Sequence, residues 1–254
     1  MNKRALVRRP GPLLDEGLLT HLERVPLDVE LARRQWQSYV DALRAEGWET
    51  IEVPPADDCP DAVFVEDTVV VLDDLAVISR PGADERKPET AATETTLASL
   101  GYRIAHIEAP GTLDGGDVLK HDRTVWVGVG GRTNDAGAEQ LAEHLAPLGA
   151  RVVAVPVALV LHLKSAVTAL PDGTVVGFEP LVDDPTTWDR FLPVPEEGGS
   201  HVVVLDDSTV LMSTSAPLSR ALFEERGLRV VAVDISEFEK LEGCVTCLSV
   251  RLRG

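Results

Sequence analysis

The stretch Leu145-Ala-Pro-Leu-Gly-Ala-Arg-Val-Val-Ala-Val-Pro156 carries the pattern that decides the fold. A helix-forming segment stops at a glycine, and a run rich in β-branched residues follows at once. Glycine at such a place supplies the left-handed residue that ends many helices, and a β-branched run predicts a strand. We therefore interpret the stretch as the end of a helix, a stop at Gly149 and a strand.

The same pattern occurs three more times, in segments 43–54, 97–108 and 223–234, with the glycine at Gly47, Gly101 and Gly227. Pairs of apolar segments lie between the copies, with turns centred on Asp73-Asp74, His121-Asp122, Pro171-Asp172-Gly173 and Asp206-Asp207. Turn residues between apolar runs are typical of β-hairpins. The longest interval between copies of the pattern runs from Gly149 to Gly227. It has room for one complete unit and one whose helix is reduced to about 185–191, so we expect five hairpin–helix–strand modules.

Each end of the chain holds part of a module. The N-terminal part has one strand, Ala5–Arg8, and a helix from about Val29 to Glu46, whereas the strand Cys247–Leu252 has no helix after it. We expect this last strand to complete the N-terminal module, so that residues 1–254 form a single domain closed into a ring with few exposed edges. Two open α/β sheets are the alternative. A doubly wound nucleotide-binding fold is disfavoured because no Gly-x-Gly-x-x-Gly or Walker sequence opens a helix.

Composition narrows the class of partner. The chain has 24 Lys and Arg against 42 Asp and Glu, for a formal net charge of −18. Such an acidic chain repels phosphate, so nucleic acids and anionic membrane surfaces are disfavoured as partners. No apolar run has the length of a membrane-spanning helix, and the first residues are too charged for a signal peptide, so we expect a cytoplasmic protein. The three cysteines are too few for a disulfide framework and predict free thiols.

Four places interrupt the apolar pattern with side chains able to do chemistry. They are Glu66 and Asp67 within an expected strand, Asp114 and Asp117 around two glycines, His162 and Lys164 on one expected strand face, and Cys244 and Cys247. Each alone has a structural explanation: a solvated acid pair, an Asp-Gly turn, a core histidine and apolar cysteines. The Cys-x-x-Cys pair lacks the strand-to-helix context of a redox site and the further ligands of a zinc site. A closed ring would instead bring all four places to its axis, where carboxylates can bind a guanidinium and a thiolate can attack its carbon.

Six motifs follow one another along the chain: Phe64-Val-Glu-Asp67, Arg80-Pro-Gly-Ala83 with Arg86-Lys87, Leu113-Asp-Gly-Gly-Asp-Val118, Arg132-Thr-Asn134, His162-Leu-Lys-Ser165 and Thr246-Cys-Leu-Ser-Val250. Together, in this order, they resemble the dimethylarginine dimethylaminohydrolases, a family of the guanidino-group-modifying or pentein superfamily. The resemblance extends from about Ala5 to Val250, and only segment 179–200 follows it poorly. It implies a five-bladed α/β propeller of pseudo-fivefold ββαβ modules, in agreement with the five modules counted above.

The resemblance also implies an activity: hydrolysis of asymmetric dimethylarginine and monomethylarginine to L-citrulline and di- or monomethylamine, through a covalent thiouronium on a cysteine. Cys247 matches the nucleophile, His162 the general acid and base, and Asp114 the acid that orients the histidine and the guanidinium, where many relatives have Glu. Glu66 and Asp67 match the pair that holds the guanidinium and the imidazole. The other matching substrate contacts are Arg86 and Arg132 for the carboxylate, Asp61 and Leu18 for the amino end, and Leu241 and Glu242 beside the nucleophile. The chemistry needs no metal or organic cofactor.

Three other functions share this arrangement. Arginine deiminase acts on unmethylated arginine, but its chains usually carry an extra helical domain. Amidinotransferases pass the group to an amine, and a ribosome anti-association factor is a binding propeller without catalysis. A complete set of Cys, His and acids favours an enzyme with a small guanidino substrate, as a monomer or a homodimer. Acids around the thiol predict an ordinary or raised pKa for Cys247 without substrate. Cys244 is interpreted as an apolar filler, with oxidative pairing to Cys247 as the alternative.

Overall fold

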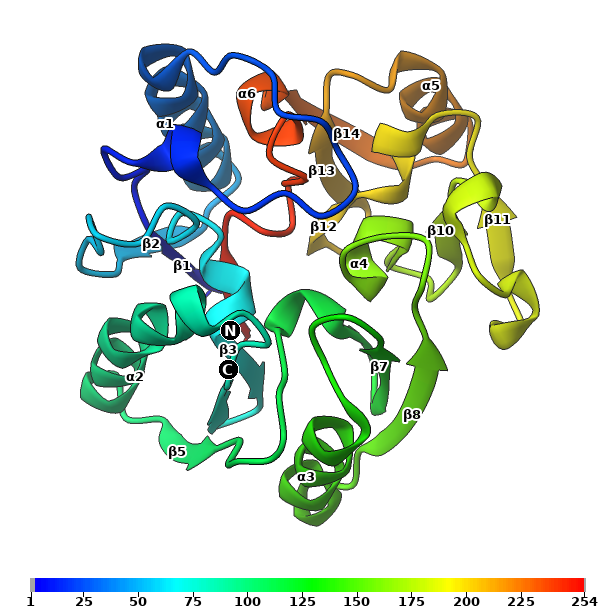
Figure 1. Cartoon of the computed structure of the whole chain (residues 1–254). Helices are drawn as coiled ribbons and strands as arrows, with labels where there is room; N and C mark the ends of the chain where they lie inside the picture. Colours follow the sequence, from blue (N-terminus) through cyan, green and yellow to red (C-terminus); the bar gives the residue numbers. More distant parts are fainter. Residues whose placement is uncertain (1–2, 254) are drawn as a thin grey trace.

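Five three-stranded sheets surround a central axis in the computed structural model, which describes residues 3–253 (Figure 1). In every sheet the middle strand pairs antiparallel with one neighbour and parallel with the other. The larger helices lie on the outside of the ring, and the first and last described strands pair in one sheet. The expected five-bladed α/β propeller is therefore confirmed.

Three modules contain a hairpin, a helix and a returning strand. Their elements are β3 (Val69–Leu72), β4 (Leu75–Ile78), α2 (Thr90–Ser99) and β5 (Arg103–His106); β6 (Val118–His121), β7 (Thr124–Val129), α3 (Asp135–Leu145) and β8 (Arg151–Pro156); and β12 (Val203–Asp206), β13 (Thr209–Ser213), α5 (Pro217–Glu225) and β14 (Arg229–Val233). Gly101, Gly149 and Gly227 have φ angles of 87°, 72° and 86°, and Gly47 has 79°. All four glycine stops are thus left-handed, as the sequence predicts.

A fourth module has no α-helix between its second and third strands. Its strands are β9 (Val167–Ala169), β10 (Val175–Gly177) and β11 (Phe191–Pro193), and the short helix α4 (Leu163–Ala166) precedes them. A 3-10 turn, Pro185–Thr187, stands where the reduced helix was expected. Trp188 is buried in the apolar cluster of this module and stacks on Phe191. The segment between the second and third strands thus contributes Val182 and Trp188 to the apolar cluster of this module.

The two chain ends meet in the fifth sheet. Its elements are β1 (Lys3–Val7), α1 (Val29–Ala45), β2 (Glu49–Glu52) and β15 (Val250–Arg253), and α6 (Ser236–Glu239) precedes the last strand. β15 pairs antiparallel with β1, with Val250 opposite Leu6, which closes the ring. The predicted start of the last strand at Cys247 is wrong. Residues 244–249 form turns closed by hydrogen bonds from Cys247 N to Cys244 O and from Ser249 N to Thr246 O, and the strand begins only after them.

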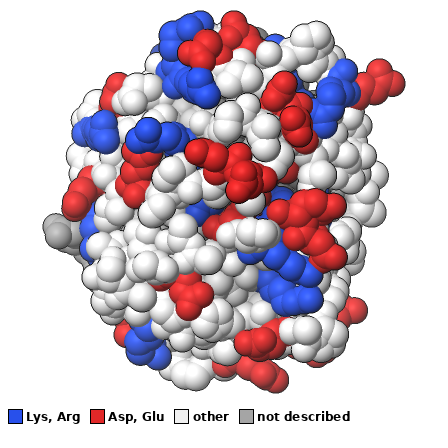
Figure 2. Space-filling model, turned by 60° about the vertical axis from the view of Figure 1, so that its left-hand side comes forward, with Lys and Arg blue, Asp and Glu red and all other residues white. Residues whose placement is uncertain are grey.

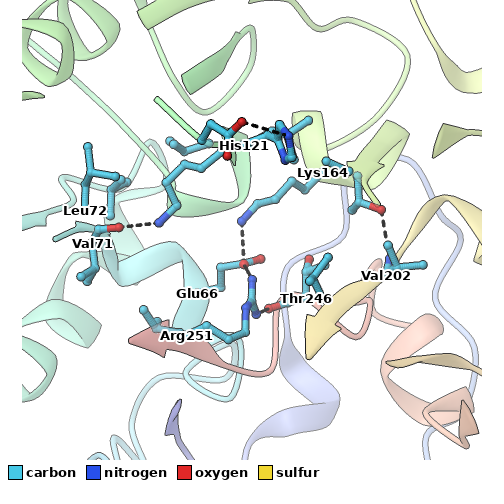
Figure 3. Close-up of a pocket in the computed structure, with 18 of the residues that line it drawn as sticks. Glu66, Val71, Leu72, His121, Lys164, Val202, Thr246 and Arg251 are labelled. Carbon is cyan, nitrogen blue, oxygen red and sulfur yellow. Dashed lines mark hydrogen bonds and ion pairs between the residues drawn. The ribbon is translucent and has the colours of Figure 1, made fainter. Parts of the chain in front are cut away.

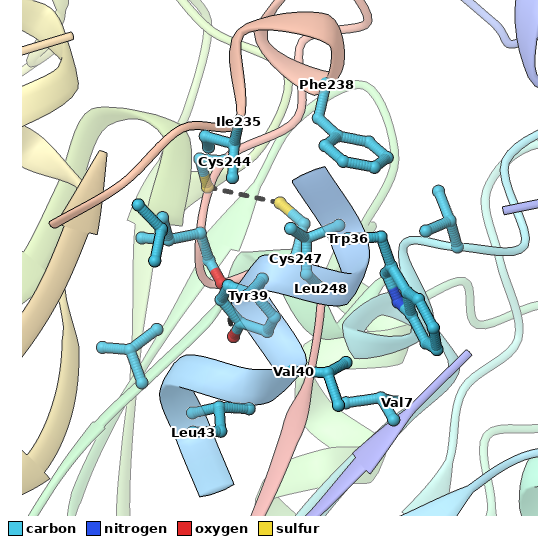
Figure 4. Packing of buried hydrophobic residues seen from close by; sticks show 14 of the residues in the cluster. Val7, Trp36, Tyr39, Val40, Leu43, Ile235, Phe238, Cys244, Cys247 and Leu248 are labelled. Carbon is cyan, nitrogen blue, oxygen red and sulfur yellow. Dashed lines mark hydrogen bonds between the residues drawn. The ribbon is translucent and has the colours of Figure 1, made fainter. Parts of the chain in front are cut away.

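The largest apolar cluster connects α1 to this turn segment (Figure 4). Tyr39 of α1 is fully buried, and its hydroxyl lies 2.9 Å from the carbonyl oxygen of Val245 and 2.7 Å from the hydroxyl of Ser249. Burial of an aromatic ring with a satisfied hydroxyl is a strong local anchor. The amphipathic helix α1 therefore fixes the backbone on which Cys247 stands.

Acidic side chains cover much of the middle of the face in Figure 2, with basic side chains interspersed among them. This view agrees with the net charge of −18 and offers phosphate no continuous basic surface. Within residues 3–253, no helix combines the length and the apolar character needed to cross a bilayer.

Candidate active site

Two cavities lie along the axis of the ring. The larger has a volume of about 420 Å³ and contains the charged groups of Glu66, Lys164 and Arg251 (Figure 3). The smaller has a volume of about 20 Å³, room for about one water molecule. Nine of the predicted site residues line it: Leu18, Asp61, Asp67, Arg86, Arg132, His162, Leu241, Glu242 and Cys247. The small pocket is the candidate active site because it alone contains both a thiol and an imidazole among its lining residues.

His162 enters the small pocket from the residue preceding α4. It has an extended backbone, with φ −138° and ψ 158°, and the helical turn begins at Leu163. The prediction that His162 and Lys164 share one strand face is wrong, because this turn separates them. The imidazole lines the small pocket, whereas the Lys164 ammonium lines the large cavity.

Asp114 reaches His162 despite having one methylene fewer than Glu. Its Oδ2 lies 3.0 Å from His162 Nε2 and 3.5 Å from Nη1 of Arg132, and its Oδ1 accepts a hydrogen bond of 3.0 Å from Gly82 N. Burial alone raises the pKa of Asp114, but the hydrogen bond and charge of His162 outweigh it and lower the pKa to about 2. Asp114 is fully buried, and its Oδ2 contacts the Nε2 side of the imidazole.

The imidazole carries a proton in the resting site. Burial alone lowers the pKa of His162, but the carboxylates of Asp67, Asp117 and Asp114 outweigh burial and raise it to about 9. A protonated histidine held on a carboxylate can act as a general acid at neutral pH.

Asp67 joins His162 to a buried arginine. Its Oδ1 accepts from Gly116 N at 2.8 Å and lies 3.8 Å from His162 Nδ1, while its Oδ2 accepts from Nη1 of Arg86 at 2.6 Å. Gly116 must be glycine, because a Cβ there would lie 2.6 Å from both Asp67 Oδ1 and His162 Nδ1. Close backbone approach thus explains one of the two glycines between Asp114 and Asp117.

Arg86 is the most heavily paired cation of the site. Besides Asp67, it donates from Nε and Nη2 to the two carboxylate oxygens of Glu89, at 3.0 and 2.7 Å. Burial disfavours its charge, but Glu89 and Asp67 outweigh burial and raise the pKa of Arg86 well above its ordinary value. The sequence did not point to Glu89, although an acid three residues after an arginine is a local signal for an ion pair.

Glu66 does not join the other predicted residues. Residues Val65–Thr68 form a 3-10 turn, not the expected strand, and the turn directs Glu66 into the large cavity. There its Oε1 lies 2.6 Å from Lys164 Nζ and 2.9 Å from Arg251 Nη2 (Figure 3). Its Oε2 is buried without a hydrogen-bond partner among the described residues. In this conformation Glu66 is part of an ion cluster behind the small pocket and does not line that pocket.

Cys247 lies beside the second cysteine of its motif. The two Sγ atoms are 3.3 Å apart, and both thiols are buried and free (Figure 4). The hydrogen bond with Cys244, burial, and the negative charges of Glu66 and Asp67 raise the pKa of Cys247 well above its ordinary value. This is the direction that the sequence predicts for the site without substrate.

The N-terminal segment covers the pocket from the side of Leu18. Leu18 N donates to Asp61 Oδ2 at 3.1 Å. Glu242 has a left-handed backbone, with φ 58°, and its Oε1 accepts from the backbone N–H groups of Thr20, His21 and Leu22 at 2.8, 2.5 and 2.8 Å. The carboxylate predicted to face substrate therefore holds the segment over the pocket through one of its oxygens.

The ligand atoms of Asp67, Asp114 and His162 lie within 4.8 Å of one another, a spacing that suits a small cation. Both carboxylates already accept backbone N–H groups and balance the charges of Arg86 and His162. We therefore interpret the three as an ion-paired set, in which Asp114 is hydrogen-bonded to His162 and Asp67 lies 3.8 Å from the other ring nitrogen.

Comparison with known proteins gives one consistent result. The family model described as arginine deiminase matches residues 53–193. A protein of Streptomyces coelicolor, N(G),N(G)-dimethylarginine dimethylaminohydrolase, is 63% identical over 252 residues, covering 99% of this chain and 98% of its own.

Solved structures agree with the sequence comparison. A dimethylarginine dimethylaminohydrolase from Pseudomonas aeruginosa, complexed with citrulline, superimposes with a TM-score of 0.93 at 32% identity, covering 99% of this chain and 100% of its own. A dimethylarginine dimethylaminohydrolase adduct with S-methyl-L-thiocitrulline gives a TM-score of 0.92 at the same identity and coverage.

Proposed function

The chain belongs to the dimethylarginine dimethylaminohydrolase family of the pentein superfamily, and from that premise we propose that it hydrolyses asymmetric dimethylarginine and monomethylarginine to L-citrulline and di- or monomethylamine. One observation carries the proposal: Cys247, His162 and Asp67 converge on a single pocket. Nucleophile, proton donor and cation-binding carboxylate are the three groups that hydrolysis of a guanidinium requires.

The first half of the proposed reaction forms a covalent intermediate. Cys247 Sγ attacks the guanidinium carbon as a thiolate, and the C–N bond to the methylated nitrogen breaks. His162 gives its proton to the departing amine. Asp114 stabilises the protonated imidazole before the transfer, from its position 3.0 Å away. Because the pKa of His162 is raised to about 9, the imidazole is protonated at neutral pH and can donate this proton.

The second half releases citrulline. A water molecule attacks the carbon of the thiouronium, and the now neutral His162 takes a proton from that water. The C–S bond breaks, the ureido oxygen of citrulline comes from water, and Cys247 is freed. One imidazole thus serves as acid and then as base.

The substrate itself supplies the charge that the thiolate needs. In the empty pocket the pKa of Cys247 is raised, which disfavours the nucleophilic form. A guanidinium bound against Asp67 would balance the surrounding acids and lower the thiol pKa, so that the nucleophile forms mainly when substrate is present. The pocket is too small for an amino acid as it stands, so substrate binding requires lining side chains such as Leu18 and Leu241 to move.

The amino-acid end of the substrate is assigned by charge. Arg132 is the better candidate for its carboxylate, because Arg86 already pairs with both Asp67 and Glu89. Asp61 and the backbone of Leu18 lie together at the pocket and suit the α-ammonium.

A product assay tests the proposed function. The enzyme is incubated separately with asymmetric dimethylarginine, monomethylarginine, arginine, and arginine plus glycine, and citrulline, methylamines and ornithine are measured. We expect citrulline with an equal amount of methylamine from both methylated substrates. If citrulline forms only in the incubation with arginine, the protein is a deiminase. If ornithine forms in the mixture of arginine and glycine, it is an amidinotransferase. If no substrate is turned over, it is a binding protein.

The covalent step has its own test. Acid quenching during turnover, followed by mass spectrometry, should find the mass of an S-alkylthiouronium on the peptide that contains Cys247, namely the substrate without its departed methylamine. The variant Cys247→Ser should show neither the adduct nor citrulline. Turnover by this variant within about tenfold of the wild-type rate would contradict nucleophilic catalysis by Cys247.

A further inference from the structure

Asp117, the second acid of the Asp114-Gly-Gly-Asp117 motif, has no part in the reaction described above. It is nevertheless buried, with 2% of its surface exposed, and its carboxylate lies between two segments of the site. A buried carboxylate is costly unless hydrogen bonds or charges compensate it, so its partners indicate what it does.

Both oxygens of this carboxylate accept a hydrogen bond. Oδ2 accepts from the hydroxyl of Thr133 at 2.6 Å, and Oδ1 accepts from Leu163 N at 2.9 Å. The Thr133 hydroxyl oxygen in turn accepts from Asp114 N at 3.1 Å. Thr133 is fully buried. One continuous chain therefore runs from the backbone of Asp114, through Thr133 and Asp117, to the residue that follows His162.

This chain and the catalytic hydrogen bond together form a closed loop. Asp114 Oδ2 and His162 Nε2 lie 3.0 Å apart, and the backbones that carry these two side chains are joined by Thr133 and Asp117. Two sets of contacts therefore fix the distance between Asp114 and the imidazole. One is the direct contact between the two side chains, and the other is the link between their backbones through Thr133 and Asp117. Catalysis is sensitive to such spacing, since an error of about 1 Å can cost about 100-fold in rate.

The position of the carboxylate has little freedom. A Cβ at Gly128 would lie 2.8 Å from Asp117 Oδ1, so β7 packs directly against this oxygen. The carboxylate also acts on the imidazole by its charge, as one of the three acids that raise the pKa of His162.

We propose that Thr133 and Asp117 are positioning residues for the general acid and base, holding the backbones of Asp114 and His162 at the spacing that proton transfer requires. This inference rests on the proposed function of His162. It gives roles to the threonine of Arg132-Thr-Asn134 and to the second acid of Asp114-Gly-Gly-Asp117, which the catalytic assignment leaves without one.

Kinetics of Thr133→Val and Thr133→Ser test the hydroxyl. The valine variant keeps the shape but removes the link, and we expect kcat to fall roughly 30-fold while KM changes less than about threefold, because the loss lies in the transition state. The serine variant restores the hydroxyl and should keep kcat within about threefold of wild type.

Thr168→Val is the matched control. Thr168 is also buried, and its hydroxyl likewise donates to an oxygen, Ser200 O at 2.6 Å, and accepts from a backbone N–H, Val202 N at 3.1 Å. Within the described residues, the hydrogen bonds of this hydroxyl go to Ser200 and Val202 and to no catalytic residue, so its loss should lower the melting temperature without lowering kcat by more than about twofold. Equal losses of kcat in Thr168→Val and Thr133→Val would overturn the proposal, as would wild-type kcat in Thr133→Val.

Asp117→Asn tests the carboxylate. Its amide oxygen can still accept from Leu163 N, but the amide NH₂ faces the Thr133 hydroxyl and one negative charge is lost. We expect kcat to fall about 100-fold and the alkaline limb of kcat/KM to move down by about one pH unit. If Thr133→Val does not fold, this variant decides the question: an unchanged kcat and an unchanged alkaline limb would overturn the proposal.

Failure of the proposed function would be visible separately, as wild-type enzyme that releases no citrulline from any guanidino substrate. In that case NMR of the His162 imidazole still tests the positioning. Its chemical shifts and pKa should change in Thr133→Val and not in Thr168→Val, and identical values in all three proteins would overturn the inference.

Discussion

Three pairs of nearby residues divide between the two cavities of the ring. The pairs are Glu66 and Asp67, Lys164 and His162, and Thr246 and Cys247; the first member of each lines the large cavity and the second lines the small pocket. A 3-10 turn, the first turn of α4 and the turns before β15 produce this division. The same three backbone segments therefore build both cavities, and only the direction of successive side chains separates them.

The two cavities differ in how their charges are used. In the large cavity, one carboxylate lies against two cations, Lys164 and Arg251, in contacts of 2.6 and 2.9 Å. In the small pocket, the thiol and the imidazole change protonation during the proposed reaction. We conclude that substitutions on the small side should act on rate, and substitutions on the large side on stability.

The largest expected effect separates the two sides directly. His162→Ala removes the acid and base, and kcat should fall about 10³-fold, within the range typical of general acid–base catalysis. Lys164→Met, two residues away on the other side, should keep kcat within about fivefold. Steady-state kinetics with asymmetric dimethylarginine measure both.

Partial rescue gives this comparison a control. Small amines or imidazole added to His162→Ala should restore part of the rate, because the missing group is a proton carrier. Equal losses of kcat in the two variants would show that the cavities are not functionally distinct.

The next effect is a dependence of stability on pH that comes from the small pocket. The folded-state pKa of His162 is about 9, above the ordinary value of 6.5, so the folded protein binds this proton more tightly than the unfolded chain. The resulting stabilisation is complete below pH 6.5 and is lost as the pH rises to about 9. The full stabilisation amounts to about 3.5 kcal/mol, since the pKa rises by about 2.5 units and each unit corresponds to about 1.4 kcal/mol.

Urea unfolding of wild type and His162→Gln at pH 6 and pH 9.5 isolates this contribution. The free energy of unfolding should fall between these pH values by about 3 kcal/mol more in wild type than in the variant. Parallel curves for the two proteins would contradict a protonated imidazole in the resting site.

The fold followed from the sequence because its signals are local and repeated. Gly47, Gly101, Gly149 and Gly227 each end a helix before a strand, and the hairpin turns fall between apolar runs. Repetition also revealed ring closure, since an unfinished first module needs the last strand. Errors arose near the site, where the backbone leaves regular structure: Cys247 lies in a turn and not in a strand.

The sequence predicted only part of the site, because it shows which residues interrupt the apolar pattern but not where each side chain points. Residues such as Asp67 and His162 interrupt apolar segments, and such interruptions are visible in a sequence. The direction of Glu66 is not, because a 3-10 turn has no period long enough to detect in four residues. Thr133 and Asp117 were recognised as motif members, but their shared hydrogen bond joins segments 16 residues apart and depends on the tertiary fold.

A smaller effect is expected from the ion cluster of the large cavity. Lys164→Met leaves Glu66 with Arg251 as its remaining cation, so the free energy of unfolding should fall by about 2 kcal/mol, less than the 3–5 kcal/mol typical of a fully broken buried pair. The double variant Glu66→Gln/Lys164→Met should lose less stability than the sum of the two single losses, because Glu66→Gln alone leaves two cations unpaired and the double variant leaves only Arg251. A double variant less stable than the sum of both single effects would contradict the assignment.

The smallest effect concerns the thiol next to the nucleophile. The hydrogen bond between Cys244 and Cys247 is the leading cause of the raised pKa of Cys247, so Cys244→Ala should lower that pKa and increase the rate of iodoacetamide alkylation at pH 7 by roughly threefold to tenfold. The kcat should change by less than about threefold, because Cys244 does not line the small pocket and the bound guanidinium supplies charge during turnover. The control is Cys59→Ala, which removes another buried thiol that lies outside this contact and should leave the alkylation rate of Cys247 unchanged. A slower alkylation in Cys244→Ala than in wild type would mean that Cys244 activates the nucleophile, and the reactive unit of the small pocket would then be the pair of thiols.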